Sequence, residues 1–111
     1  MKDVTLPSGK SVSVPSTGRD WELFTASMKC GRAAAAMTAA LVRIAKEVDK
    51  AALKGFRPSE AGAEKLYVDM LYPVMSKYST YGACDTEPRG VAYDAIEKIV
   101  STLTGDRPRY F

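Results

Sequence analysis

Histidine is absent from this chain of 111 residues. Because histidine is the commonest general base, the usual switch near neutral pH and a frequent metal ligand, its absence excludes the most familiar catalytic and imidazole–metal sites. Only two cysteines occur, Cys30 and Cys84, and no CxxC pattern indicates a zinc knuckle or a redox pair. We expect both to be small buried hydrophobic residues, with a disulfide between them left open.

Long apolar runs are missing as well. No stretch approaches the roughly 20 apolar residues that a membrane span requires. Residues 1–7 lack the apolar segment of a signal peptide, so a cytoplasmic protein is expected. The hydrophobic fraction of 46% and the charged fraction of 26% are typical of a globular chain, and we expect one domain over residues 1–111. A net charge of +3 is well below the basic excess of a DNA-coating protein.

The hydrophobic pattern predicts a mainly α fold, a small bundle of three to four helices with a short N-terminal β-hairpin. The hairpin is expected over residues 1–16, around a turn at residues 7–10. The first helical region is predicted over 17–55, with Thr17 and Asp20 as its N-terminal cap. Gly31 is a point where this region ends or bends, so whether it forms one helix or two stays open.

The second half of the chain is predicted to continue with helices. A helix is expected over residues 57–80, with a kink or a break at Pro73, which lacks a backbone donor. A loop over 81–90, a last helix over 91–104 and a tail over 105–111 follow. Met37, Leu41, Ile44 and Val48 form the clearest apolar stripe of the first helical region.

No group of residues matches a catalytic site. Residues 9–11, Gly-Lys-Ser, resemble the end of a phosphate-binding loop, but the glycine needed five residues earlier is replaced by Val4. We therefore interpret them as a hairpin turn with a solvated Lys10. The carboxylate pairs at 60/64 and 94/97 are interpreted as solvated helix faces. The sequence thus predicts no catalytic, cofactor-binding or metal-binding residues, and no enzyme.

Binding is the remaining interpretation, and three features could support it. Five cations at spacings of three and four form what we call the basic ridge, opposite the Met37–Val48 stripe: Arg43, Lys46, Lys50, Lys54 and Arg57. Glu47 and Asp49 lie beside it and dilute its charge. The ridge is either a solvated helix face or a contact to an acidic partner, which could be a protein or a phosphate backbone.

Aromatic residues supply the other two features. Tyr72 and Tyr81 fall off the apolar stripe of their helix and are expected to be exposed, where tyrosine is common in binding sites. The tail is either a frayed end or a docking segment for a partner or a second copy, through Arg107, Arg109, Tyr110 and Phe111. The predicted partner is a protein. A homo-oligomer stays open, nucleic acid is not favoured and no membrane is expected.

Two opening motifs carry a family resemblance. Residues 4–10, Val-Thr-Leu-Pro-Ser-Gly-Lys, and residues 15–20, Pro-Ser-Thr-Gly-Arg-Asp, resemble the start of some phage tail assembly chaperones. The resemblance implies a phage-encoded protein of the host cytoplasm that binds the helices of the tape-measure protein and tail-tube subunits, without catalysis. Two alternatives stay open. One is a phage-encoded inhibitor of a host defence complex, of the anti-CRISPR type, and the other is a virion structural or decoration subunit.

Overall fold

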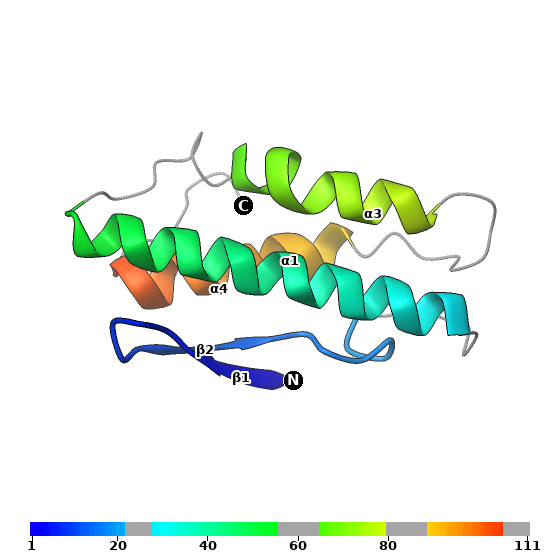
Figure 1. Ribbon diagram of the computed structural model, residues 1–111, viewed down its shortest axis with the longest axis horizontal. Coiled ribbons are helices and arrows are strands. Elements are labelled where there is room, and N and C mark those ends of the chain that lie inside the picture. Colours follow the sequence, from blue (N-terminus) through cyan, green and yellow to red (C-terminus); the bar gives the residue numbers. More distant parts are fainter. Residues whose placement is uncertain (22–27, 56–64, 80–88, 106–111) are drawn as a thin grey trace.

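The structure is a computed structural model that describes residues 1–21, 28–55, 65–79 and 89–105. Side chains are described for all of these except residues 28–30, 67, 78, 79 and 89. The elements are β1 (Lys2–Thr5), β2 (Ser11–Val14), α1 (Met28–Leu53), η1 (Tyr67–Leu71), α3 (Tyr72–Ser79) and α4 (Arg89–Thr104). Helix α1 runs the length of the molecule, with α3 along one side, α4 behind it and the hairpin beneath (Figure 1). The predicted mainly α fold with an N-terminal hairpin is confirmed.

The hairpin is antiparallel, and its register pairs Val4 with Val12 and Lys2 with Val14. Gly9 takes a φ of 90°, a left-handed conformation that glycine adopts without a steric penalty. The Leu6 amide donates to the Lys10 carbonyl at 2.8 Å and closes the turn. Side chains of β2 alternate between exposed and buried, so one face of the hairpin covers α1 and α4.

Helix α1 begins at Met28, earlier than the break predicted near Gly31. Gly31 lies inside the helix on its exposed side, so the expectation of an end or bend there is wrong. Glycine costs about 1 kcal/mol relative to alanine inside a helix, and the alanine-rich turns that follow have the highest helix propensity. Two of these alanines, Ala33 and Ala34, are also buried in the core. Gly55, with a φ of 81°, ends the helix as predicted.

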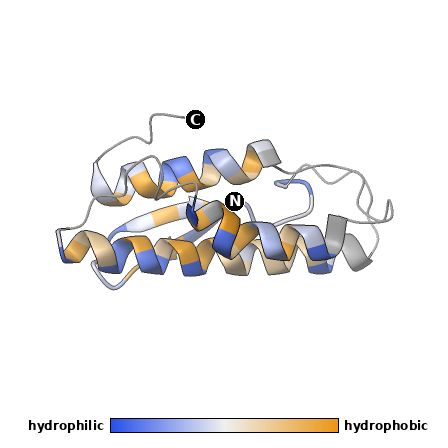
Figure 2. Ribbon diagram, turned by 90° about the horizontal axis from the view of Figure 1, so that it is seen from above, coloured by the Kyte–Doolittle hydropathy of each residue, from blue (hydrophilic) through white to orange (hydrophobic). Residues whose placement is uncertain are grey.

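The predicted stripe of α1 forms the centre of the core. Met37, Leu41, Ile44 and Val48 are all buried. Because each helix is apolar along one side only, polar and hydrophobic residues alternate along the ribbons (Figure 2). The buried residues of the other elements that complete this core are Leu6, Val12, Val14, Trp21, Leu71, Met75, Ala92, Ala95, Ile96, Ile99, Val100 and Leu103.

The predicted interruption of the second helical region is confirmed, and it takes the form of a π-helical turn. The chain is π-helical over η1 and returns to α-helical geometry in α3. Pro73 lacks an N–H, and in an α-helix its ring would clash with the carbonyl four residues earlier, that of Asp69. Asp69 belongs to η1, whose wider turn displaces this carbonyl. Of the helix predicted over 57–80, residues 65–79 belong to the described part of the chain.

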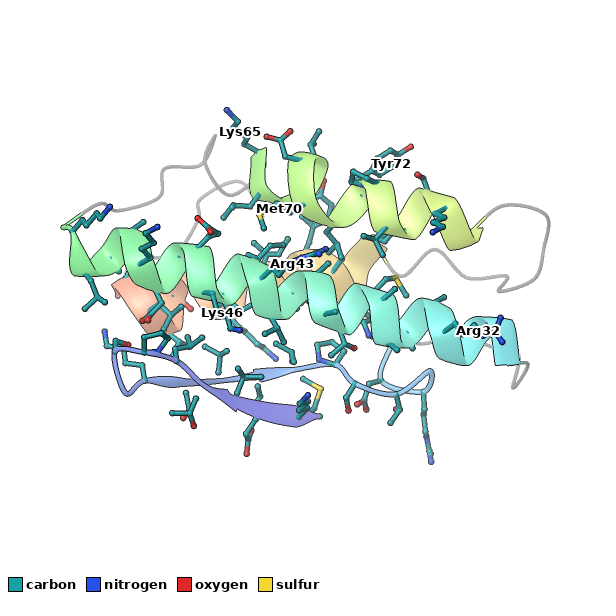
Figure 3. The ribbon with its side chains drawn as sticks, in the orientation of Figure 1. Arg32, Arg43, Lys46, Lys65, Met70 and Tyr72 are labelled. Carbon is teal, nitrogen blue, oxygen red and sulfur yellow. The ribbon has the colours of Figure 1, made fainter. Side chains whose placement is uncertain are left out.

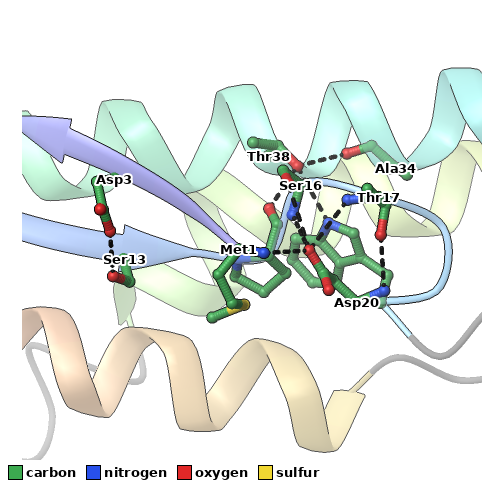
Figure 4. A network of polar contacts seen from close by, with 10 residues as sticks. Met1, Asp3, Ser13, Ser16, Thr17, Asp20, Ala34 and Thr38 are labelled. Carbon is green, nitrogen blue, oxygen red and sulfur yellow. Dashed lines mark hydrogen bonds and ion pairs between the residues drawn. The ribbon is translucent and has the colours of Figure 1, made fainter.

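Residues 15–21 form a turn in which the predicted cap contacts are present. The Asp20 amide donates to Thr17 Oγ1 at 3.0 Å, and the Thr17 amide donates to the Asp20 carboxylate at 3.4 Å (Figure 4). The Trp21 amide also donates to the Thr17 carbonyl at 3.1 Å, a bond between residues four apart as in the first turn of an α-helix, so the predicted cap at Thr17 and Asp20 is confirmed. Asp20 also accepts from the Ser16 amide and pairs with the Met1 ammonium, which ties the segment back to the hairpin. Residues 22–27, which would join the turn to α1, lie outside the described residues.

Trp21 anchors this turn in the core. Its side chain is fully buried, and Nε1 donates to Thr38 Oγ1 at 3.1 Å. The Thr38 hydroxyl lies 2.7 Å from the Pro15 carbonyl and 2.8 Å from the Ala34 carbonyl, either of which can accept its proton. The buried indole N–H and the buried hydroxyl therefore both have partners, as buried polar groups require. The contact joins the end of the hairpin to α1.

The turn around Asp20 predicts a dependence of stability on pH. The Met1 ammonium and then the Ser16 amide hold the pKa of Asp20 well below its usual range. A group whose pKa is lowered on folding contributes stability above its ordinary pKa, and this contribution is lost as the pH falls. We expect the free energy of unfolding to decrease as the pH falls through about 4 and below. Asp20→Asn should remove this part of the dependence in acid titrations followed by circular dichroism, and an unchanged profile would contradict the assignment.

Candidate binding surface

The four described residues of the basic ridge all lie on the exposed side of α1 and its C-terminal turn. Because they recur every three or four residues, the helix places them on one side, away from the buried Met37–Val48 stripe. Arg43 and Lys46 are seen on the face of α1 turned toward the viewer in Figure 3. The prediction that these residues are exposed is confirmed for Arg43, Lys46, Lys50 and Lys54. Arg57 lies outside the described residues.

A further cation belongs to this face and was missed in the sequence. Arg32 is exposed and lies eleven residues before Arg43, which is close to three helical turns. That spacing places Arg32 on the same side of α1, although several alanines separate it from the basic ridge. We define the α1 cationic face as Arg32 together with Arg43, Lys46, Lys50 and Lys54.

Positive charge on this face is poorly balanced. Residues 31–55 contain five basic and two acidic residues, which equals the whole net charge of +3 of the chain. Asp49, expected to dilute the ridge, has only 2% of its side chain exposed and points into the fold, so that expectation is wrong. Glu47 is the exposed carboxylate of this segment. Within the described residues, no carboxylate pairs with any cation of the face.

The turn of the hairpin contacts α1 at Asp49. The Asp49 carboxylate accepts the Ser8 hydroxyl at 2.5 Å and the Ser8 amide at 3.2 Å. Hydrogen bonds to a carboxylate are shorter and stronger than those between neutral groups, so they compensate for removing this charge from water. The sequence signal is faint, because an acidic residue beside lysines on an amphipathic helix is usually solvated.

Replacing Asp49 with alanine should reveal this docking contact. We expect the free energy of unfolding to fall by about 1.5–3 kcal/mol, because Ser8 loses two hydrogen bonds to a charged acceptor. Glu47→Ala is the matched control: it removes an exposed carboxylate from the same helix and should change stability by less than about 0.5 kcal/mol. Urea denaturation measures both variants. Equal effects would mean that the Ser8–Asp49 contact does not stabilise the fold.

Lys10 is exposed, as predicted, and also makes a contact with α4. Its ammonium donates to the Leu103 carbonyl at 3.2 Å, near the C-terminal end of α4. A helix leaves its last carbonyls without partners inside the helix, and a cation favours that end. The interpretation of residues 9–11 as a hairpin turn with an exposed Lys10 is confirmed, and the contact with Leu103 is an addition to it. The turn thus joins α1 through Ser8 and α4 through Lys10.

Tyr72 is exposed, as predicted, with 53% of its side chain accessible. It is the first residue of α3 and lies four residues after Val68 of η1, which is 51% exposed. Tyr72 and Lys65 point away from α1, while Met70 lies between the two helical segments (Figure 3). Tyr72 and the α1 cationic face therefore occupy different sides of the molecule. The other predicted contact residues lie outside the described residues: Tyr81, Arg107, Arg109, Tyr110 and Phe111.

Leu53 is a second residue that the sequence reasoning missed. It is 67% exposed, the largest value among the large hydrophobic side chains of the described residues. At about 100° per residue, Leu53 falls within about 60° of Lys46 and Lys50 around the helix. Its proximity to the basic ridge could have been read from the spacing, but its exposure depends on where α4 and the hairpin end.

A metal site would need several ligands close together. The described residues contain no group of three histidine, cysteine or acidic residues placed to hold a metal ion. None of the helices described has the length and apolar character needed to cross a bilayer. Cys30 falls within α1, and Cys84 lies outside the described residues, so their expected states remain predictions.

Comparisons with known proteins give no match. No family model, no curated protein and no solved structure is similar to the chain at the level of a significant match.

Proposed function

We propose that this protein is a non-catalytic binding module that holds an acidic protein partner on the α1 cationic face. One observation carries the proposal: residues 31–55, which carry this exposed face, hold a net charge equal to that of the whole chain, and no described carboxylate pairs with the cations of the face. Unpaired cations on one face attract an acidic surface, speed its association and fix its orientation. The lack of histidine supports a role without catalysis.

A protein partner fits this face better than nucleic acid does. Proteins that bind nucleic acid typically combine a strongly basic domain with a recognisable groove-reading motif. Here the net charge is +3, and the exposed Leu53 borders the basic ridge. Contact with a charged phosphate backbone removes little apolar surface of Leu53 from water. An apolar residue of a protein partner can cover this side chain and make its burial favourable.

The resemblance to phage tail assembly chaperones indicates which biological partner this face would bind. That partner would be a helical segment of a tape-measure protein or a tail-tube subunit, bound in the host cytoplasm before assembly. The two motifs of the resemblance contribute to docking the hairpin, through Ser8, Lys10 and Asp20. They support a similar N-terminal architecture, and the α1 cationic face supports the binding role.

A competition experiment tests the acidic protein partner. Labelled poly-L-glutamate is titrated with the full chain by fluorescence anisotropy, and duplex DNA of matched total charge is then added. We expect saturable binding of poly-L-glutamate that weakens with rising salt and resists displacement by the duplex. Preferential binding of the DNA would contradict the proposal, and so would an absence of poly-L-glutamate binding at low salt.

Co-expression tests the chaperone role separately. A tape-measure protein that precipitates when expressed alone should stay in solution when this chain is produced with it. A variant in which Lys46, Lys50 and Lys54 are replaced with glutamate serves as the control and should leave the tape-measure protein insoluble. Equal precipitation with and without the chain would remove the chaperone role and leave the binding module intact.

A further inference from the structure

We infer that the partner is an acidic amphipathic helix that lies along α1, with carboxylates facing the basic ridge and an apolar side chain covering Leu53. The inference rests on the proposed function, because it names the shape of the partner that the α1 cationic face would bind. It is carried by the spacing of the exposed cations and by the exposure of Leu53 beside them.

Spacing along α1 favours a helical partner. The cations at 43, 46, 50 and 54 span eleven residues, or about 16 Å at 1.5 Å per residue. A helix laid beside α1 presents side chains on one side every three or four residues, and so repeats this spacing. An extended strand presents same-side residues about 6.7 Å apart, so four of them span about 20 Å and lose register with the ridge.

Leu53 adds an apolar requirement to the charge requirement. Its side chain is 67% exposed, more than any other large hydrophobic side chain among the described residues. Because it lies near Lys46 and Lys50 around the helix, a partner that faces these lysines also approaches Leu53. A purely acidic surface would leave Leu53 in water, whereas an amphipathic helix can place a leucine or phenylalanine over it.

The methylene groups of the lysine side chains favour this arrangement. These groups can lie along apolar surface while the ammonium groups stay in water, so the lysines around Leu53 extend its apolar area. The occupant that matches both properties has carboxylates at positions i, i+3, i+7 and i+11, and an apolar residue at the edge of that row. This pattern is what a search of candidate partner sequences should seek.

Three synthetic peptides of equal length and charge test the shape of the partner. The patterned peptide carries carboxylates at i, i+3, i+7 and i+11 with leucine at the edge. The scrambled peptide has the same composition and the same helicity by circular dichroism, with its carboxylates distributed around the helix. The interrupted peptide keeps the patterned order but contains a central proline, which prevents a continuous helix.

Fluorescence anisotropy with the full chain should rank the peptides. We expect the patterned peptide to bind at least tenfold more tightly than either of the others. Equal affinity for all three would overturn the helical partner while leaving an acidic protein partner in place. Failure of every acidic peptide, together with failure of poly-L-glutamate, would overturn the proposed function itself.

A pair of variants tests the apolar contact. Leu53→Ala should weaken binding of the patterned peptide about tenfold, because its leucine loses most of the apolar surface that it covers. Val68→Ala removes a similarly exposed aliphatic side chain from η1 and should leave the affinity unchanged. Thermal unfolding curves confirm that both variants fold. Equal affinities for Leu53→Ala and the unmodified chain would overturn the role of Leu53.

Discussion

Replacing Trp21 with alanine is expected to lower the free energy of unfolding by about 3–5 kcal/mol, the range typical of removing a buried tryptophan. The indole is fully buried, and Nε1 donates to the Thr38 hydroxyl. Alanine would leave a cavity between the turn and α1 and would remove a donor from Thr38. A domain of this size is stabilised by about 5–15 kcal/mol, so the loss would be a large fraction of the total.

Far-UV circular dichroism during urea denaturation is the measurement for Trp21, because the chain contains a single tryptophan and the variant loses its fluorescence signal. Trp21→Phe is the control. It keeps most of the buried ring and loses the hydrogen bond, so its effect should be clearly smaller. A loss below about 1 kcal/mol for Trp21→Ala would show that Trp21 does not anchor the hairpin end to α1.

Reversing the charge of Lys46, Lys50 and Lys54 to glutamate is expected to weaken binding of the patterned acidic peptide about 100-fold at low salt. An exposed ion pair contributes about 0.2–1 kcal/mol, and reversal replaces each attraction with a repulsion of similar size. Three such changes together amount to about 3 kcal/mol, or roughly 100-fold in affinity. The difference should shrink as salt rises, because the charges are exposed and screened.

The matched control reverses three exposed lysines outside α1, namely Lys2, Lys65 and Lys98. It changes the net charge by the same amount and should reduce affinity far less, because these residues lie away from the α1 cationic face. Melting temperatures of both variants separate binding from stability, since glutamate near the C-terminal end of α1 also opposes the helix dipole. Equal losses in the two variants would mean that total charge, and not the face, determines binding.

The fold class could be predicted because the stripe of α1 and the alternation in β2 depend on local spacing. Met37, Leu41, Ile44 and Val48 recur at helical spacing, and burying them requires only that something pack against one side of the helix. Gly31 was misjudged because propensity is a weak preference, which the surrounding helix and its packing override. The contact between Trp21 and Thr38 could not be predicted, because the two residues lie seventeen positions apart in the sequence.

The binding surface could be predicted only in part, for a related reason. Helical spacing places the cations of the basic ridge on one side, and this much follows from the sequence. Whether a neighbouring carboxylate reduces their charge depends on tertiary contacts, since Asp49 faces Ser8, 41 residues away. The exposure of Leu53 likewise depends on where other elements end. Long-range pairs such as these leave no local pattern to read.

The most direct test of the central claim is a chemical-shift map of the labelled chain with the patterned acidic peptide. We expect the amide signals that move to form a continuous set along α1 from Arg43 to Lys54, with Leu53 methyl signals among them. Signals of β1, of η1 around Val68 and of Tyr72 should stay in place. Shifts concentrated on η1 and α3, with α1 unchanged, would contradict the assignment of α1 as the binding surface.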